Sequence, residues 1–141
     1  MVVQVGGDVR SVLEMVAAAT TEIETWSAAD AIARVADPGV LFVDLRDVRE
    51  VWREGTIPGA YHAPRGMLEF WVDPASPYAR DTFQQNKRFV FFCASGWRSA
   101  LSTKTVQDMG LSPVCHIGGG FTAWKAAGGP IEERSQNPAK T

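Results

Sequence analysis

Two short apolar segments constrain the fold of this chain more than any other feature. Residues 40–45 read VLFVDL and residues 89–92 read FVFF, and apolar and polar residues do not alternate along either segment. A half-exposed strand alternates, whereas a strand covered on both faces carries a continuous apolar run. Both segments are far shorter than the roughly 20 apolar residues that cross a bilayer. They therefore indicate fully buried strands of a parallel sheet.

Helical patterns alternate with these strands. Ser27 and Asp47 each precede a segment with an acidic residue three positions later, which is typical of a capped helix start. Residues 71–87 contain two prolines and predict a long loop with one helical turn at most. The alternation indicates an α/β fold with a mainly parallel sheet. A first helix is expected after Asp8, with Val9, Val12, Leu13 and Val16 on one apolar stripe. Further helices are expected after Ser27 and Asp47 and over 98–109 and 121–127. Further strands are expected over 23–26, 61–62 and 114–117.

Composition limits the class of protein. The chain has 141 residues, the usual size of a single domain. Its 14 basic and 16 acidic residues give a formal net charge of −2, without the basic excess of a nucleic-acid-binding protein. The start, MVVQVGGDVR, shows no basic segment followed by an apolar one, as a secretory signal would. We expect a soluble, cytoplasmic protein that binds neither nucleic acid nor membrane, and the sequence assigns no oligomeric state.

The two cysteines are far apart in the sequence. Cys93 and Cys115 form no C-x-x-C pair, so neither a disulfide framework nor a zinc site is expected. Cys115 lies inside a predicted strand and is expected to be an inert core thiol, because a resolving role would require it to lie close to Cys93. His62 and His116 lack the spacing of metal ligands and are expected to be structural.

The segment CASGWRS, residues 93–99, has the strongest chemical signal. It follows the strand over 89–92 and leads into the predicted helix, so it lies at the carboxyl end of a parallel strand, where ligands bind. The turn directs several backbone N–H groups to one point, and the helix start adds partial positive charge. Gly96 permits close approach to the backbone, and Arg98 adds a cation suited to oxyanions. The loop is therefore predicted to bind an anion, with the Cys93 sulfur at its base.

The same groups favour an ionised thiol. A free cysteine is only about 3% thiolate at pH 7, and helix N-termini and nearby arginines increase that fraction. Most free cysteines are small buried apolar side chains. Strand, turn and helix in series favour Cys93 as a nucleophile over that ordinary role.

Four motifs in the right order resemble the single-domain rhodanese (sulfurtransferase) family, over residues from about 23 to 131. The resemblance implies a central five-stranded, mainly parallel sheet with helices on both faces. It divides the chain into an N-terminal helical extension (1–20), a rhodanese-like domain (21–131) and a loose C-terminal tail (132–141). The motifs are DLRDVRE at 44–50, GTIPGA at 55–60, CASGWRS at 93–99, and GGGF at 118–121 followed by Trp124 and GGP at 128–130.

The resemblance implies transfer of a sulfane sulfur. The Cys93 thiolate would attack the outer sulfur of a small anionic donor such as thiosulfate, release sulfite and become a persulfide. A thiophilic acceptor such as cyanide would then remove that sulfur, and no metal or organic cofactor is required. Cys93 and Arg98 are the expected catalytic residues. The expected substrate-binding residues are Ala94, Ser95, Gly96, Trp97, Ser99, Arg65 and Glu50, with Asp44 and Arg46 forming an internal ion pair that supports the loops.

Two positions depart from the family pattern. Thr56 replaces the usual histidine of the GHIPGA turn, a position we interpret as structural. Glu50 stands where some thiosulfate-using members carry a basic residue, and its carboxylate would repel a dianionic donor. The natural donor therefore stays open.

Two other functions compete with this hypothesis. Phosphatases and arsenate reductases of the related cell-cycle type have a C-x5-R loop, in which the extra residue widens the site for a tetrahedral phosphate. Here four residues separate Cys93 from Arg98, which favours sulfur. The third reading is a non-catalytic binding module on a rhodanese scaffold, and the presence of the cysteine counts against it.

Overall fold

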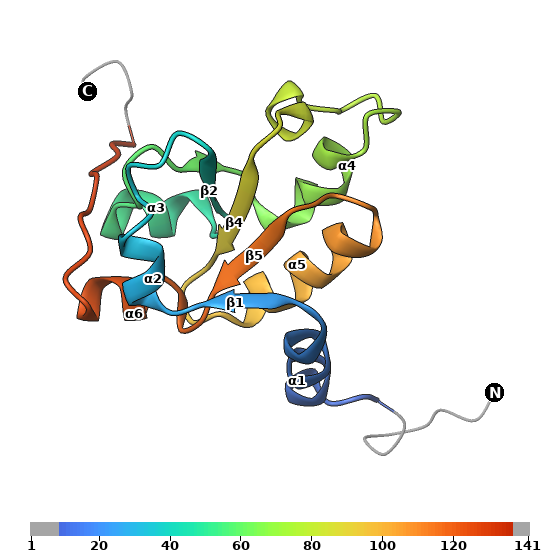
Figure 1. Cartoon of the computed structure of the whole chain (residues 1–141), viewed down its shortest axis with the longest axis horizontal. Coiled ribbons are helices and arrows are strands. Elements are labelled where there is room, and N and C mark those ends of the chain that lie inside the picture. The colour runs from blue at the N-terminus through green and yellow to red at the C-terminus, as the bar shows by residue number, and fades with distance from the viewer. Residues whose placement is uncertain (1–8, 137–141) are drawn as a thin grey trace.

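The computed structural model describes residues 9–136, which fold around one five-stranded parallel sheet (Figure 1). The strand order is β1-β5-β4-β2-β3, and every neighbouring pair is parallel. The predicted α/β class and five-stranded sheet are confirmed. The strands are β1 (Glu24–Trp26), β2 (Val40–Asp44), β3 (Tyr61–His62), β4 (Arg88–Phe92) and β5 (Val114–Ile117).

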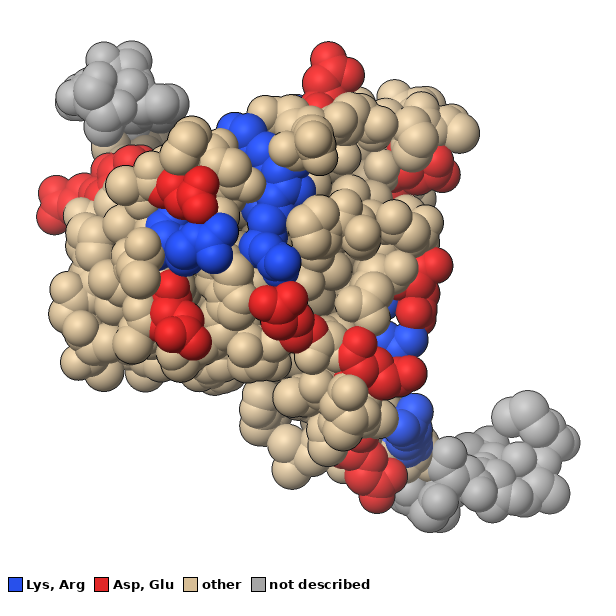
Figure 2. Space-filling view, viewed as in Figure 1, with Lys and Arg blue, Asp and Glu red and all other residues tan. Residues whose placement is uncertain are grey.

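Helices cover both faces of the sheet. The α-helices are α1 (Val12–Glu22), α2 (Ala28–Ile32), α3 (Val48–Glu54), α4 (Leu68–Val72), α5 (Trp97–Asp108) and α6 (Gly120–Ala126), with short 3-10 helices η1 (Arg65–Met67) and η2 (Asp81–Gln84). Among the described residues, no helix is long and apolar enough to cross a membrane. On the face of the molecule seen in Figure 2, basic and acidic side chains are interleaved.

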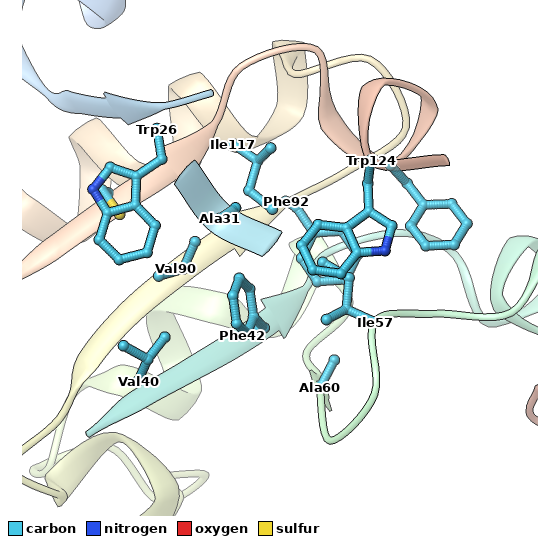
Figure 3. Close-up of a cluster of buried hydrophobic side chains, with 12 residues drawn as sticks. Trp26, Ala31, Val40, Phe42, Ile57, Ala60, Val90, Phe92, Ile117 and Trp124 are labelled. Carbon is cyan, nitrogen blue, oxygen red and sulfur yellow. The ribbon is translucent and has the colours of Figure 1, made fainter. Parts of the chain in front are cut away.

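The continuous apolar run of β4 has a direct structural explanation. Val90 and Phe92 point into a cluster formed with α2 and α6 (Figure 3). Phe89 and Phe91, the alternate positions, point into a second cluster formed with α4 and α5. Since both faces of the strand are buried, every position after Arg88 is apolar.

Local capping fixes the helix starts near the site. Asp47 accepts a hydrogen bond from the backbone of Arg49, and its own N–H donates to Glu50, which completes a capping box for α3. Gly55, at φ 78°, ends that helix. Ser27 caps α2 by accepting from the N–H of Asp30. These starts agree with the sequence patterns.

The first helix differs from its prediction. Its N-cap is Ser11, and the predicted cap, Asp8, lies outside the described residues. The expected apolar stripe is not buried: Val9, Val12 and Leu13 are exposed, and Ala19 is the buried residue. The helix contacts α5 at the edge of the molecule (Figure 1), so small side chains further along the helix form its contact.

Two further segments form local structure, and in the first of them η2 supplies the predicted helical turn. The predicted loop at 71–87 overlaps the end of α4 and contains η2. Its aromatic side chains hold it, because Tyr61 packs edge-on against Trp71 and Phe83. At the start of the expected loose tail, Glu132 pairs with Thr56 in an antiparallel bridge. Backbone pairing therefore holds residue 132 against the domain.

Candidate active site

The Cys93 loop is held between β4 and the start of α6. The Phe121 N–H donates to the Cys93 carbonyl (2.8 Å) and the Thr122 N–H to the Ala94 carbonyl (3.1 Å). Gly120 makes this approach possible, because a Cβ there would collide with the Cys93 carbonyl oxygen and lie 2.7 Å from the Ala94 oxygen. The glycine run at 118–120 thus packs α6 directly onto the loop.

The Cys93 sulfur lies at the N-terminus of α5. The N–H of Gly96 donates to Sγ at 3.2 Å and the N–H of Ser99 at 3.4 Å, and the Ser99 hydroxyl lies 3.7 Å away. Gly96 is the left-handed N-cap residue (φ 104°), so the helix begins at Trp97 and not at Arg98 or Ser99 as predicted. Two amides and the partial positive charge of a helix start therefore converge on one sulfur.

The loop differs from the predicted open anion site in one respect. Cys93 is only 1% exposed, and the amides of Gly96 and Ser99 are engaged by its sulfur. Ser95 and Trp97 are exposed on the outer side of the loop, with Trp97 at 49%. The four-residue turn closes tightly around Sγ, which leaves its donors directed at the sulfur itself.

Arg98 is paired with Glu50 across the rim of the loop. The guanidinium donates to both carboxylate oxygens, at 2.9 and 3.0 Å. This pairing lowers the pKa of Glu50 and raises that of Arg98, and contact with Cys93 raises the Arg98 value further. The capping box of α3 holds Glu50 in place through the Asp47 N–H. The two predicted residues thus lie together as an ion pair at the rim of the loop.

A buried ion pair supports the loops beneath the site. Asp44 and Arg46 are fully buried and joined by two hydrogen bonds of 3.0 and 2.7 Å. Thr56 donates to the same carboxylate at 2.7 Å, and Arg46 also donates to the Gly55 carbonyl. The Arg46 guanidinium lies 4.3 Å from the centre of the Phe121 ring, on the helix that packs on the Cys93 loop. The threonine that departs from the family pattern therefore holds this network together.

Arg65 is placed differently from the other predicted residues. Its side chain pairs with Glu69 at 2.7 Å, one helical turn later. It lines a cavity of about 310 Å³ between α1 and α5, together with Ala18 and Leu101. Within residues 9–136, no hydrogen bond or ion pair joins Arg65 to the Cys93 loop. Glu69 thus holds the Arg65 guanidinium in the structure, and a substrate contact of Arg65 stays a prediction.

Cys115 and His116 occupy opposite faces of β5. Cys115 lies in the apolar cluster of Figure 3, and burial raises its pKa to about 12. His116 faces α5, where Nδ1 lies 2.9 Å from the Ser99 hydroxyl. Sequence reasoning missed this contact, and the alternation of side chains along β5 is the signal that could have found it. No group of His, Cys, Asp or Glu suited to a metal occurs in the described part of the chain.

Comparisons with known proteins agree with this geometry. The rhodanese-like domain family matches residues 27–127. The chain is 33% identical over 90 residues to a Bacillus subtilis (strain 168) protein named "Putative sulfurtransferase YtwF", covering 64% of this chain and 78% of that one. The present chain spans half or less of the length of three further curated relatives.

Two solved structures are informative. A Rhodopseudomonas palustris protein described as of unknown function and a possible tyrosine phosphatase is 54% identical, with a TM-score of 0.87, covering 94% of this chain and 99% of that one. The polysulfide-sulfur transferase homodimer of Wolinella succinogenes is 27% identical, with a TM-score of 0.64 and 88% coverage of each chain. With a buried cysteine at the carboxyl end of the central strand and the family match over most of its length, this chain belongs to the rhodanese-like domain family.

Proposed function

We propose that the protein is a sulfurtransferase that carries a sulfane sulfur on Cys93. The observation that carries the proposal is the convergence of the Gly96 and Ser99 amides on Sγ at the start of α5. Uncharged donors stabilise an anionic sulfur without neutralising it, which preserves a nucleophile. Family membership and the sulfurtransferase name of the relative from Bacillus subtilis support the same reaction class.

The reaction would proceed in two balanced steps. The Cys93 thiolate attacks the outer sulfur of a donor such as thiosulfate; the donor's S–S bond breaks, and sulfite leaves with the electron pair. The resulting persulfide anion is then attacked at its outer sulfur by an acceptor such as cyanide, which releases thiocyanate and restores the thiolate. Amides of the 94–99 loop other than those of Gly96 and Ser99, which already bond to Sγ, would hold the outer sulfur, and neither step needs a metal or an organic cofactor.

Access to the sulfur would require a small local change. Cys93 is 1% exposed, and the Arg98–Glu50 pair lies at the rim. We expect that pair to separate when a donor binds, so that Arg98 turns to the donor's anionic group. Glu50 would then disfavour dianionic donors such as thiosulfate relative to singly charged ones, a class that includes short polysulfide and persulfide anions near neutral pH.

Phosphatase activity is the second candidate, because the solved structure at 54% identity is described as a possible tyrosine phosphatase. A phosphatase needs a loop with hydrogen-bond donors for the three oxygens of a cysteinyl phosphate. Here the amides of Gly96 and Ser99 already bond to the sulfur. The four-residue turn between Cys93 and Arg98 therefore favours sulfur transfer over phosphoryl transfer.

Mass spectrometry after incubation with thiosulfate tests the proposal. We expect an addition of about 32 Da on Cys93, reversed by cyanide with formation of thiocyanate, since only a covalent sulfur intermediate predicts it. Cys93→Ser should abolish the addition, whereas Cys115→Ser should retain it. Hydrolysis of p-nitrophenyl phosphate without any sulfur addition, with thiosulfate or with polysulfide, would instead support the phosphatase.

A further inference from the structure

A chain of three side chains leads from the Cys93 sulfur to the surface. The Ser99 hydroxyl lies 3.7 Å from Sγ and 2.9 Å from Nδ1 of His116, and it also donates to the Gly96 carbonyl at 3.2 Å. On the other side of the imidazole, Nε2 lies 3.1 Å from the hydroxyl of Thr25. Ser99 and His116 are buried, whereas Thr25 is exposed. The otherwise covered sulfur is thus connected to the solvent by hydrogen bonds.

The sheet register places these groups in line. Thr25 of β1 is paired with His116 of β5, so their side chains share one face of the sheet. The neighbours of His116 on β5, Cys115 and Ile117, point into the apolar cluster on the other face. His116 therefore points to α5, where Ser99 lies in the first turn after the Cys93 loop.

We propose that His116 is a positioning residue of the sulfur site, which orients the Ser99 hydroxyl so that it donates to the Cys93 thiolate instead of to the Gly96 carbonyl. A neutral imidazole has one donor and one acceptor nitrogen, so Nδ1–H can donate to Ser99 only while Nε2 accepts from Thr25. Burial supports the neutral form, because it lowers the pKa of His116 to about 4. The inference rests on the proposed function, in which this thiolate is the nucleophile.

Ionisation of the thiol reverses the direction of every hydrogen bond in this chain. The sulfur becomes an anion, and the three other side chains stay neutral. In the neutral thiol, S–H donates to Ser99, Ser99 to Nδ1, and Nε2–H to Thr25. On ionisation, each proton moves one position along, from sulfur to Ser99 to His116 to Thr25 and then to water. His116 stays neutral and exchanges only its tautomer. The charged groups facing the sulfur from α5 and α3 are Arg98 and its partner Glu50, and they are unchanged in this step.

Titration of the thiolate by ultraviolet absorbance tests the proposal, with the Cys93→Ser spectrum subtracted. The second thiol does not interfere near neutral pH, because the pKa of Cys115 is raised to about 12. Ser99→Ala should raise the pH midpoint of thiolate formation by about one unit, the value of a hydrogen bond to a charged group. His116→Gln should raise it similarly, because its amide lies near the position of Nε2 and does not reach Ser99. His116→Asn, whose amide N–H lies near the position of Nδ1, should retain the original midpoint.

Coupling and controls separate positioning from packing. The double variant of Ser99→Ala with His116→Gln should show the Ser99→Ala midpoint alone, because His116 acts through Ser99. The matched control His62→Gln should leave the midpoint unchanged. Equal shifts in the Asn and Gln variants, or additive shifts in the double variant, would overturn the proposal.

A measurement on the unaltered chain covers the case in which a variant does not fold. Nitrogen NMR should show the His116 proton moving from Nε2 to Nδ1 over the pH range in which the thiolate forms, and no such change in Cys93→Ser. A tautomer that does not change would contradict the proposal. Neither measurement uses a sulfur donor, so a chain without sulfurtransferase activity would still give a clear answer.

Discussion

Replacement of Glu50 by glutamine should improve the binding of dianionic sulfur donors. The carboxylate bonds Arg98 at 2.9 and 3.0 Å, and the two side chains are 20% and 40% exposed. A donor anion bound beside Arg98 would lie about 6 Å from that carboxylate, and an effective dielectric constant of about 60 gives ~0.9 kcal/mol of repulsion per unit charge. For thiosulfate the repulsion is about 1.8 kcal/mol, which corresponds to a KM about 20-fold lower in Glu50→Gln.

Steady-state sulfur transfer to cyanide measures this effect against donors of different charge. Methanethiosulfonate carries one negative charge, so its KM should fall only about fivefold. Both changes should diminish as salt is added. Glutamine preserves the capping box of α3, so the fold is retained. Glu54→Gln, on the same helix but paired with Lys125, is the matched control and should leave both KM values unchanged. An equal change for the two donors, or none, would refute the electrostatic reasoning.

Three other perturbations have outcomes that follow from the structure. Burial lowers the pKa of His116 to about 4, whereas the unfolded chain titrates near 6.5, so the unfolded state binds one more proton between those pH values. The free energy of unfolding, measured in urea, should therefore fall by up to about 3 kcal/mol from pH 7 to pH 4. A His116→Asn chain should lose less. Gly120→Ala should lower the melting temperature by several degrees and reduce activity, because its Cβ would meet the Cys93 and Ala94 carbonyls. Gly59→Ala, also at positive φ but with open space around it, should lower the melting temperature clearly less. Equal losses in the two variants would contradict the packing argument. Thr56→Val removes a donor to the buried Asp44 carboxylate, so it should cost about 1–3 kcal/mol in the same unfolding assay, and an unchanged stability would show that Asp44 does not depend on it.

The features predicted correctly from the sequence are those fixed by neighbouring residues. The runs at 40–45 and 89–92 are apolar because each strand is covered on both faces, so a short continuous apolar run without alternation indicates them. The start of α3 depends on Asp47 and Glu50, which lie within one helical turn. Features of this kind depend on residues close together in the sequence, so they can be predicted without the structure.

The features that sequence reasoning missed depend on segments far apart in the chain. Val12 and Leu13 at the start of α1 are exposed, whereas Ala19, nearly two turns further along the helix that contacts α5, is buried. Arg65 follows β3 as expected, and its pairing with Glu69 was not predicted. The alternation of side chains along β5 indicates only the face on which His116 lies, and its contact with Ser99 also depends on how α5 packs on that face. The burial of Cys93 likewise follows from the packing of α6 on its loop.

Charge balance gives an argument for sulfur chemistry that is independent of loop length. The groups that bond to the Cys93 sulfur are uncharged amides and a hydroxyl, and Arg98, a cation that also interacts with Cys93, is paired with Glu50. A thiolate places one negative charge in this site, and a persulfide replaces it with another single charge. A cysteinyl phosphate would place nearly two charges there at neutral pH, and the paired Arg98 offers no additional compensation unless Glu50 is displaced. The same ion pair that disfavours a dianionic donor therefore disfavours a dianionic intermediate, and both effects favour sulfur transfer through a singly charged persulfide.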